Sequence, residues 1–142
     1  MQVLLVEPGK EARPFEMEDT LKAMQDIVGG HIQATHTWNN SVALVCNEDG
    51  KLTGLPANRQ LGNGDIVVGT FVVCGLKDDE FCSLSNKQME QYKAMFQNPE
   101  LFFYCDSGLL VKKCSPEEYA QVMQDREGQK KAAHKRHKEQ ER

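Results

Sequence analysis

The sequence predicts an α+β fold: a single mixed, mostly antiparallel sheet with two helices packed on it and a further helix at the C-terminus. Short apolar or alternating runs bounded by turn residues indicate several strands. Capped segments with helical spacing of apolar residues lie between them. Since strands and helices do not alternate strictly, one sheet with both helices on one face is the simplest arrangement.

The N-terminal third of the chain predicts two strands and a helix. Val3–Val6 is a short apolar run that indicates a buried strand, and a polar link follows over residues 10–14. A helix is predicted over about 18–28, ended by Gly29-Gly30 because glycine readily adopts the left-handed conformation. Residues 31–38 alternate in character, which is typical of a half-buried strand.

The middle of the chain holds the two most apolar strand candidates. Val42–Cys46 is followed by the turn signal Asn47–Gly50, which predicts a hairpin returning through Lys51–Thr53. Residues 54–60 are predicted to form an irregular loop. Ile66–Leu76 is the longest apolar run and indicates a central strand that is covered on both faces.

The C-terminal part predicts a helix, a hairpin and a last helix. A capping box precedes a helix over 86–96. Segments 101–105 and 109–113 flank a turn and predict a small hairpin. A second capping box begins the last helix, so we expect a compact domain over 1–114 and a C-terminal helix with a basic tail over 115–142.

Charge is distributed unevenly along the 142 residues, whose formal net charge is −4. Residues 126–142 carry about +4, and residues 1–125 carry about −8. An acidic body argues against a broad nucleic-acid-binding face, which needs clustered basic residues. No apolar run approaches the length of a membrane span, and no signal peptide is recognised, so we expect a cytoplasmic protein without membrane partners.

The cysteines and the paired histidines of the tail do not form a recognised metal motif. The five cysteines, none in a Cys-x-x-Cys pair, are expected to be reduced thiols. His134 and His137 fall on one helical face, but two ligands without a third make a weak metal site. No metal and no cofactor is therefore predicted.

Several blocks of sequence resemble a known family. They are Val6–Lys10, Met24–Gly30, Val45–Leu52, Gly54–Arg59, Asp65–Phe71, Ser83-Leu84 and Asn98–Glu100. In this order they resemble domain-of-unknown-function family 3846, small proteins of bacteria, phages and mobile elements, over about residues 1–112. The resemblance implies a phage or mobile-element accessory protein, which would act in the host cytoplasm if it is phage-encoded. The family has no assigned activity, so the resemblance implies no catalytic residues.

No group of residues has the pattern of a catalytic site. Acidic residues cluster at turns and helix starts, where solvation and capping account for them. Cys46 or Cys82 with His31 or His36 could form a thiol–imidazole pair, but no local sequence signature supports one. We therefore predict a protein that is not an enzyme.

The loop that ends in Asn58 and Arg59 is the predicted ligand-binding site. Arg59 offers a planar fork of five donors that suits a phosphate, and Asn58 both donates and accepts hydrogen bonds. Trp38 could stack on a base or on Arg59, and Asn47 and Thr70 complete the predicted site. The alternative is that Asn58 caps a turn and Arg59 pairs with an acidic neighbour.

These features favour a non-catalytic protein that sequesters a small nucleotide, such as a cyclic nucleotide or a cyclic ADP-ribose type immune signal of the host. The first alternative is a protein–protein interaction module that inhibits a host or phage protein through an acidic face at Asp78, Asp79 and Glu80. The second is a hydrolase of the same nucleotides. A homo-oligomer stays open, because a small domain forms a ligand-sized pocket more easily at a subunit interface.

Overall fold

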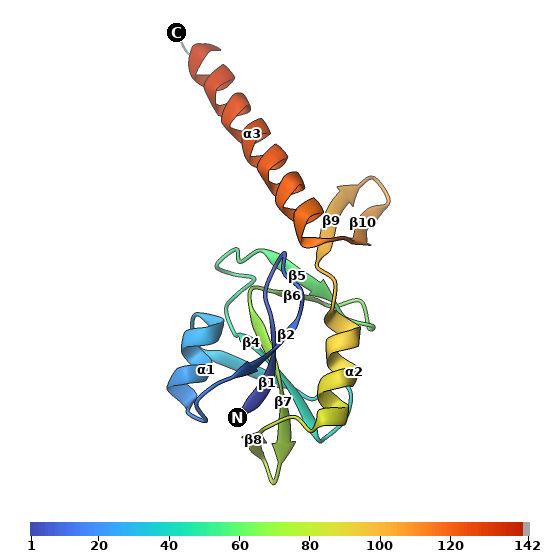
Figure 1. The fold of residues 1–142 in the computed structure, drawn as a ribbon. Coiled ribbons are helices and arrows are strands. Elements are labelled where there is room, and N and C mark those ends of the chain that lie inside the picture. The colour runs from blue at the N-terminus through green and yellow to red at the C-terminus, as the bar shows by residue number, and fades with distance from the viewer. Residues whose placement is uncertain (141–142) are drawn as a thin grey trace.

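A central antiparallel sheet organises the chain, as seen in a computed structural model that describes the backbone of residues 1–140 and the side chains of residues 1–132 (Figure 1). The helices are α1 (Leu21–Val28), α2 (Asn86–Phe96) and α3 (Pro116–Gln140). The strands are β1 (Gln2–Val6), β2 (Arg13–Glu16), β3 (Ile32–Thr35), β4 (Val42–Asn47), β5 (Ala57–Gln60), β6 (Ile66–Val68), β7 (Phe71–Lys77), β8 (Glu80–Cys82), β9 (Glu100–Cys105) and β10 (Gly108–Lys113).

The central sheet has the strand order β2-β1-β7-β4-β3, with β8 paired to β7. Every strand pair in the described part of the chain is antiparallel. The predicted α+β class, the mostly antiparallel sheet and the C-terminal helix are confirmed. The expected single sheet is supplemented by two separate two-stranded sheets, β5–β6 and β9–β10.

The two short helices cover opposite faces of the central sheet. Residues alternate between faces along each strand, so Leu4 and Val73 pack with Tyr92 of α2, whereas Leu5 and Val72 pack with Met24 of α1. Figure 1 shows α1 and α2 on either side of the sheet. The expectation that both helices share one face is wrong, because the inner strands are apolar on both faces and each face needs a cover.

Local capping defines both helices. The Thr20 hydroxyl accepts a hydrogen bond from the Ala23 amide, and Gly29 ends α1 with φ of 80°. Ser85 and Gln88 form the predicted capping box at the start of α2.

The chain differs from prediction where it crosses between sheets. Lys51–Thr53 belongs to a compact turn in which the Thr53 amide donates to the Asp49 carbonyl, so no strand returns beside β4. The predicted strand over 66–76 divides into β6 and β7, because Gly69 has φ of 71° and redirects the chain. Strands β2, β5 and β8 replace segments predicted as links, loops or turns.

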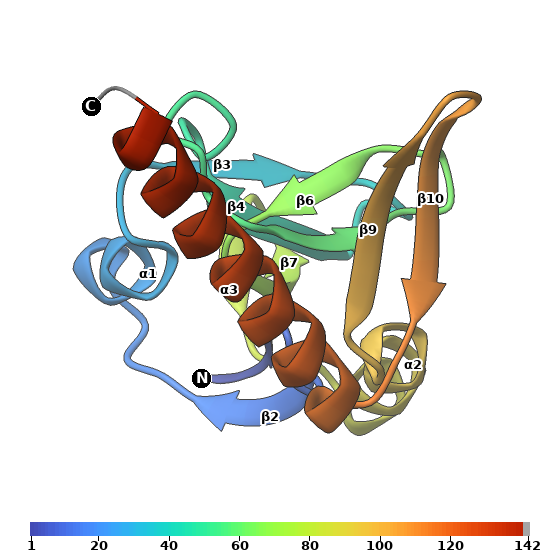
Figure 2. The same cartoon turned by 90° about the horizontal axis from the view of Figure 1, so that it is seen from above.

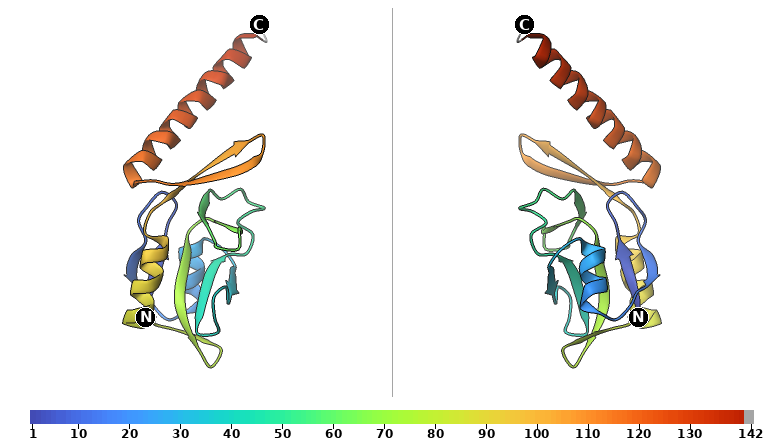
Figure 3. Two further views of the ribbon diagram at one scale, coloured as in Figure 1. Left: turned by 90° about the vertical axis from the view of Figure 1, so that its right-hand side faces the viewer. Right: turned by 90° about the vertical axis from the view of Figure 1, so that its left-hand side faces the viewer.

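The β9–β10 hairpin lies between the body of the molecule and α3 (Figures 1 and 3). Arg126 of α3 donates to the Phe102 carbonyl at 2.9 Å, and its guanidinium carbon lies 5.1 Å from the centre of the Phe103 ring. Seen from above, α3 crosses the end of the body rather than lying along it (Figure 2). His134 and His137 lie outside the described side chains. Within the described residues, no helix is both long and apolar enough to cross a bilayer.

Candidate functional site

Asn58 of the predicted site is buried in the core. Its side-chain amide donates to the carbonyls of Val6, at 2.9 Å, and Gly69, at 2.8 Å. These bonds tie β5 to the end of β1 and to the junction between β6 and β7. The side chain therefore satisfies backbone acceptors and does not face a ligand.

Arg59 is fully buried, with an exposed fraction of 0%. Its guanidinium donates to the carbonyls of Phe96, at 3.0 and 3.3 Å, and of Lys10, at 2.7 Å, and to Oδ1 of Asn58, at 2.8 Å. Burial lowers the pKa of Arg59 to about 10, although the nearby Glu100 carboxylate opposes the shift. At neutral pH the group stays charged, and the carbonyl at the end of α2 suits that charge.

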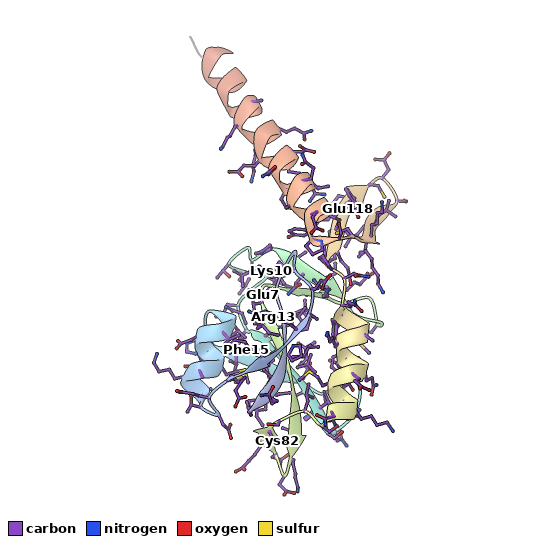
Figure 4. The ribbon with its side chains drawn as sticks, in the orientation of Figure 1. Glu7, Lys10, Arg13, Phe15, Cys82 and Glu118 are labelled. Carbon is purple, nitrogen blue, oxygen red and sulfur yellow. The ribbon has the colours of Figure 1, made fainter. Side chains whose placement is uncertain are left out.

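The prediction that Arg59 offers its donors to a phosphate does not fit this burial. Nor does Arg59 form an ion pair with a carboxylate in the described part of the chain; backbone carbonyls take that place. Figure 4 shows Lys10 with Glu7 and Arg13 near the β1–β2 connection, where Glu7 pairs with both cations at 3.4 Å. Arg59 thus fastens the β1–β2 connection to the end of α2.

Trp38 and Thr70 also do not lie where the predicted ligand-binding site requires them. The Trp38 ring packs on Tyr92, with centroids 4.7 Å apart, and on Phe96, at 5.8 Å. It does not stack on Arg59: the two cation–π contacts among the described residues join other pairs. Thr70 is half-buried in the link between β6 and β7. The five predicted residues therefore do not converge on one cavity.

Asn47, the fifth predicted residue, lines a cavity of about 430 Å³ that we call the β4–β6 groove. The groove lies on the α2 side of the central sheet, between β3–β4 and the β5–β6 hairpin. Its polar lining residues are Gln33, Thr35, His36, Thr37, Asn47, Glu48, Lys51, Asn63 and Asp65. Its apolar lining residues are Leu44, Cys46, Leu52, Leu61, Ile66, Val67 and Val68.

Strand register builds the floor of the groove. Gln33 lies opposite Cys46 and Thr35 opposite Leu44, so all four side chains share one face of the sheet. Asn47 at the end of β4 is itself held in place: its amide donates to the Val28 carbonyl at 3.2 Å, and its oxygen accepts from the Asp49 amide. Asn47 therefore shapes the groove more than it offers free donors to it.

The groove has few charged side chains. Lys51 is the only lysine or arginine among the described lining residues, and Glu48 and Asp65 are the acidic ones. Burial raises the pKa of the Cys46 thiol, and the Lys51 charge opposes this. Cys46 and His36 line the same groove, but a raised thiol pKa is the reverse of what a cysteine nucleophile needs.

Sequence reasoning missed Lys51, Glu48 and the polar face of β3. Lys51 and Glu48 stand in a turn whose glycine and acidic residues are explained by chain reversal alone. The residues that lie opposite Gln33 and Thr35 in the sheet depend on the register between β3 and β4, and no local sequence pattern determines that register. Among the residues that the structure describes, no group of three His, Cys, Asp or Glu side chains is placed to hold a metal ion.

Comparison with known proteins identifies the family of the chain. The model of a domain of unknown function, DUF3846, matches residues 1–97, which is more than half of the chain. The chain belongs to the DUF3846 family. This confirms the resemblance, although the match ends one residue after α2, so that β9, β10 and α3 lie beyond it. No curated protein and no solved structure matches the chain significantly.

Proposed function

We propose that this DUF3846 protein binds a small nucleotide in the β4–β6 groove and sequesters it without turnover. The observation that carries the proposal is a groove of ligand size, about 430 Å³, in which one ammonium group and two carboxylates lie among neutral hydrogen-bonding side chains. It replaces the Asn58–Arg59 loop as the proposed site.

The charges of the lining narrow the class of ligand. Lys51 is suited to one phosphate group, whereas Glu48 and Asp65 would repel a polyphosphate. The same carboxylates accept hydrogen bonds from sugar hydroxyls or from an amino group of a base. A ligand with few phosphates, such as a cyclic nucleotide or a cyclic ADP-ribose, fits better than a nucleoside triphosphate.

Sequestration accounts for the chemistry of the groove. The raised pKa of Cys46 keeps its thiol protonated, so an activated nucleophile is not supported there. In the phage or mobile-element setting that the resemblance implies, the ligand is a host immune signal, and one protein removes one signal molecule.

Calorimetry against a panel of cyclic nucleotides, cyclic ADP-ribose and ATP tests the proposal. We expect binding of at least one cyclic ligand, weakened about tenfold by Lys51→Gln because one charge-assisted contact is lost. Lys87→Gln, an exposed lysine of α2, is the matched control. Chromatography after denaturation must return the ligand intact; a converted ligand indicates an enzyme, and a folded protein that binds no member of the panel refutes the proposal.

A second candidate function, an interaction module for a host or phage protein, is favoured by the tip of the β7–β8 hairpin. Asp78 and Asp79 have φ of 52° and 62° there, a left-handed conformation that places two carboxylates at an exposed turn. The exposed Leu21 and Glu80 border a hollow beside it. Affinity capture with wild type and with these acidic residues reversed tests it; equal capture of the partner rejects this face.

A further inference from the structure

A second cavity, of about 330 Å³, shares part of its lining with the β4–β6 groove. We call it the hairpin pocket, because Phe102, Tyr104 and Leu109 of the β9–β10 hairpin form one of its walls. Lys51, Ile66 and Val68 line both cavities. The two cavities therefore adjoin at these three residues and are considered together as one candidate site.

The hairpin pocket differs in chemistry from the groove. Its lining is apolar apart from Lys51 and the Tyr104 hydroxyl, and it contains no acidic residue in the described part of the chain. The β4–β6 groove, in contrast, carries the two carboxylates and most of the polar side chains. One end of the site thus suits a flat apolar group and the other a hydroxyl-rich group, with a single cation between them.

Tyr104 supplies a ring for such a flat group. It is 92% exposed, although its cross-strand partner Leu109 is half-buried on the same face of the hairpin. An exposed aromatic ring that borders an apolar pocket can stack on a nucleobase, since every base presents a π-face. Alternation along the hairpin directs Phe103 and Leu110 to the opposite face, where Arg126 of α3 lies.

We propose that the ligand spans both cavities, with its base stacked on Tyr104, its phosphate beside Lys51 and its sugar in the β4–β6 groove. This rests on the proposed function and deepens it: the base of the nucleotide is recognised by its own pocket, in addition to the phosphate and the sugar. It also assigns a binding role to β9–β10, which lies beyond the family match.

Calorimetry with 3′,5′-cyclic AMP and with ribose 5-phosphate tests the inference on the full chain. We expect Tyr104→Ala to weaken cyclic AMP binding at least about fivefold, and Tyr104→Phe to retain it, because stacking needs the ring and not the hydroxyl. Ribose 5-phosphate is expected to bind more weakly and to be insensitive to both changes. Leu110→Ala, an exposed position (58%) on the opposite face of the same hairpin, is the control.

The outcomes separate the two proposals. Cyclic AMP binding that depends on Lys51 but is equal in wild type and Tyr104→Ala overturns the stacking role and leaves the groove as the site. Equal weakening by Leu110→Ala and Tyr104→Ala also overturns it, since disruption of the hairpin then explains the loss. If neither probe nor any member of the nucleotide panel binds, both proposals fall.

Discussion

At Arg59 a guanidinium group lies out of reach of solvent and donates to carbonyl groups of separate chain segments. Lys10 belongs to the β1–β2 connection, and Phe96 to the last turn of α2. A buried charge is costly unless its donors are satisfied, and these carbonyls would be equally costly without a donor. The residue is therefore a structural crosslink. The guanidinium donors that suggested phosphate binding are used by backbone carbonyls inside the protein.

Arg59→Ala is expected to lower the free energy of unfolding by about 3–5 kcal/mol, because it leaves several buried carbonyls unsatisfied and creates a cavity. Urea unfolding followed by circular dichroism measures this. Arg13→Ala, which removes a largely exposed arginine with one ion pair, should cost about 1 kcal/mol or less. Similar losses for the two variants would contradict the crosslink. Should Arg59→Ala not fold, Arg59→Lys keeps the charge but not the planar fork and gives an intermediate loss.

The buried thiol of Cys74 is expected to make the free energy of unfolding decrease as the pH becomes alkaline. Burial raises the pKa of its thiol from 9.0 to about 12, so the unfolded chain releases this proton first. Its contribution is fully present below pH 9 and is lost as pH rises toward 12. Between pH 7 and pH 10 the loss amounts to about 1 kcal/mol.

Comparison of urea unfolding at pH 7 and pH 10 isolates this contribution. Cys74→Ala should lose less stability over that range than wild type. Cys105→Ala is a control for which the opposite change is expected, a larger loss of stability over that range than in wild type. The reason is that hydrogen bonds from Ser107 lower the pKa of the exposed Cys105 thiol. An unchanged pH response in Cys74→Ala would show that the thiol does not carry the effect.

At the scale of elements, segments with local signals were predictable. The helix over 86–96 follows from its capping box, and the hairpin around residues 106–107 from its turn residues. Each of these elements is specified by residues within a few positions of one another. Their predicted bounds therefore agree with those of α2, and with those of β9 and β10 to within one residue.

Elements specified by distant partners were not predictable. Strand β5 contains Asn58 and Arg59, two polar residues that are typical of a loop when only the sequence is considered. In the structure their side chains donate to backbone carbonyls of Val6, Lys10 and Phe96, which are distant in the sequence. The candidate site is of the same kind, because Lys51 belongs to a turn and Tyr104 to a hairpin more than fifty residues later in the chain. Only the tertiary fold brings them to a common cavity, the hairpin pocket.

At the scale of the whole molecule, the chain separates an acidic, packed body from a basic helical end. The described side chains from Gln124 to Ala132 are all exposed, and Arg126 is the one that contacts the hairpin through a hydrogen bond. A helix that is polar all round gains little from tertiary packing. The groove and the hairpin pocket, by contrast, are lined by residues between Gln33 and Leu109.

Removal of residues 129–142 should therefore leave the free energy of unfolding within about 0.5 kcal/mol of the full chain, because Arg126 and its contacts remain. The affinity for cyclic AMP should also be unchanged, although the truncation removes about four net positive charges. Urea unfolding, calorimetry and sedimentation of both proteins provide the measurements.

A loss of binding together with a smaller sedimenting species would contradict the expectation, since the basic helix would then reach the site of a neighbouring copy. A loss of binding at constant mass would instead mean that the charge of the tail itself attracts the ligand, and binding would then weaken steeply with added salt.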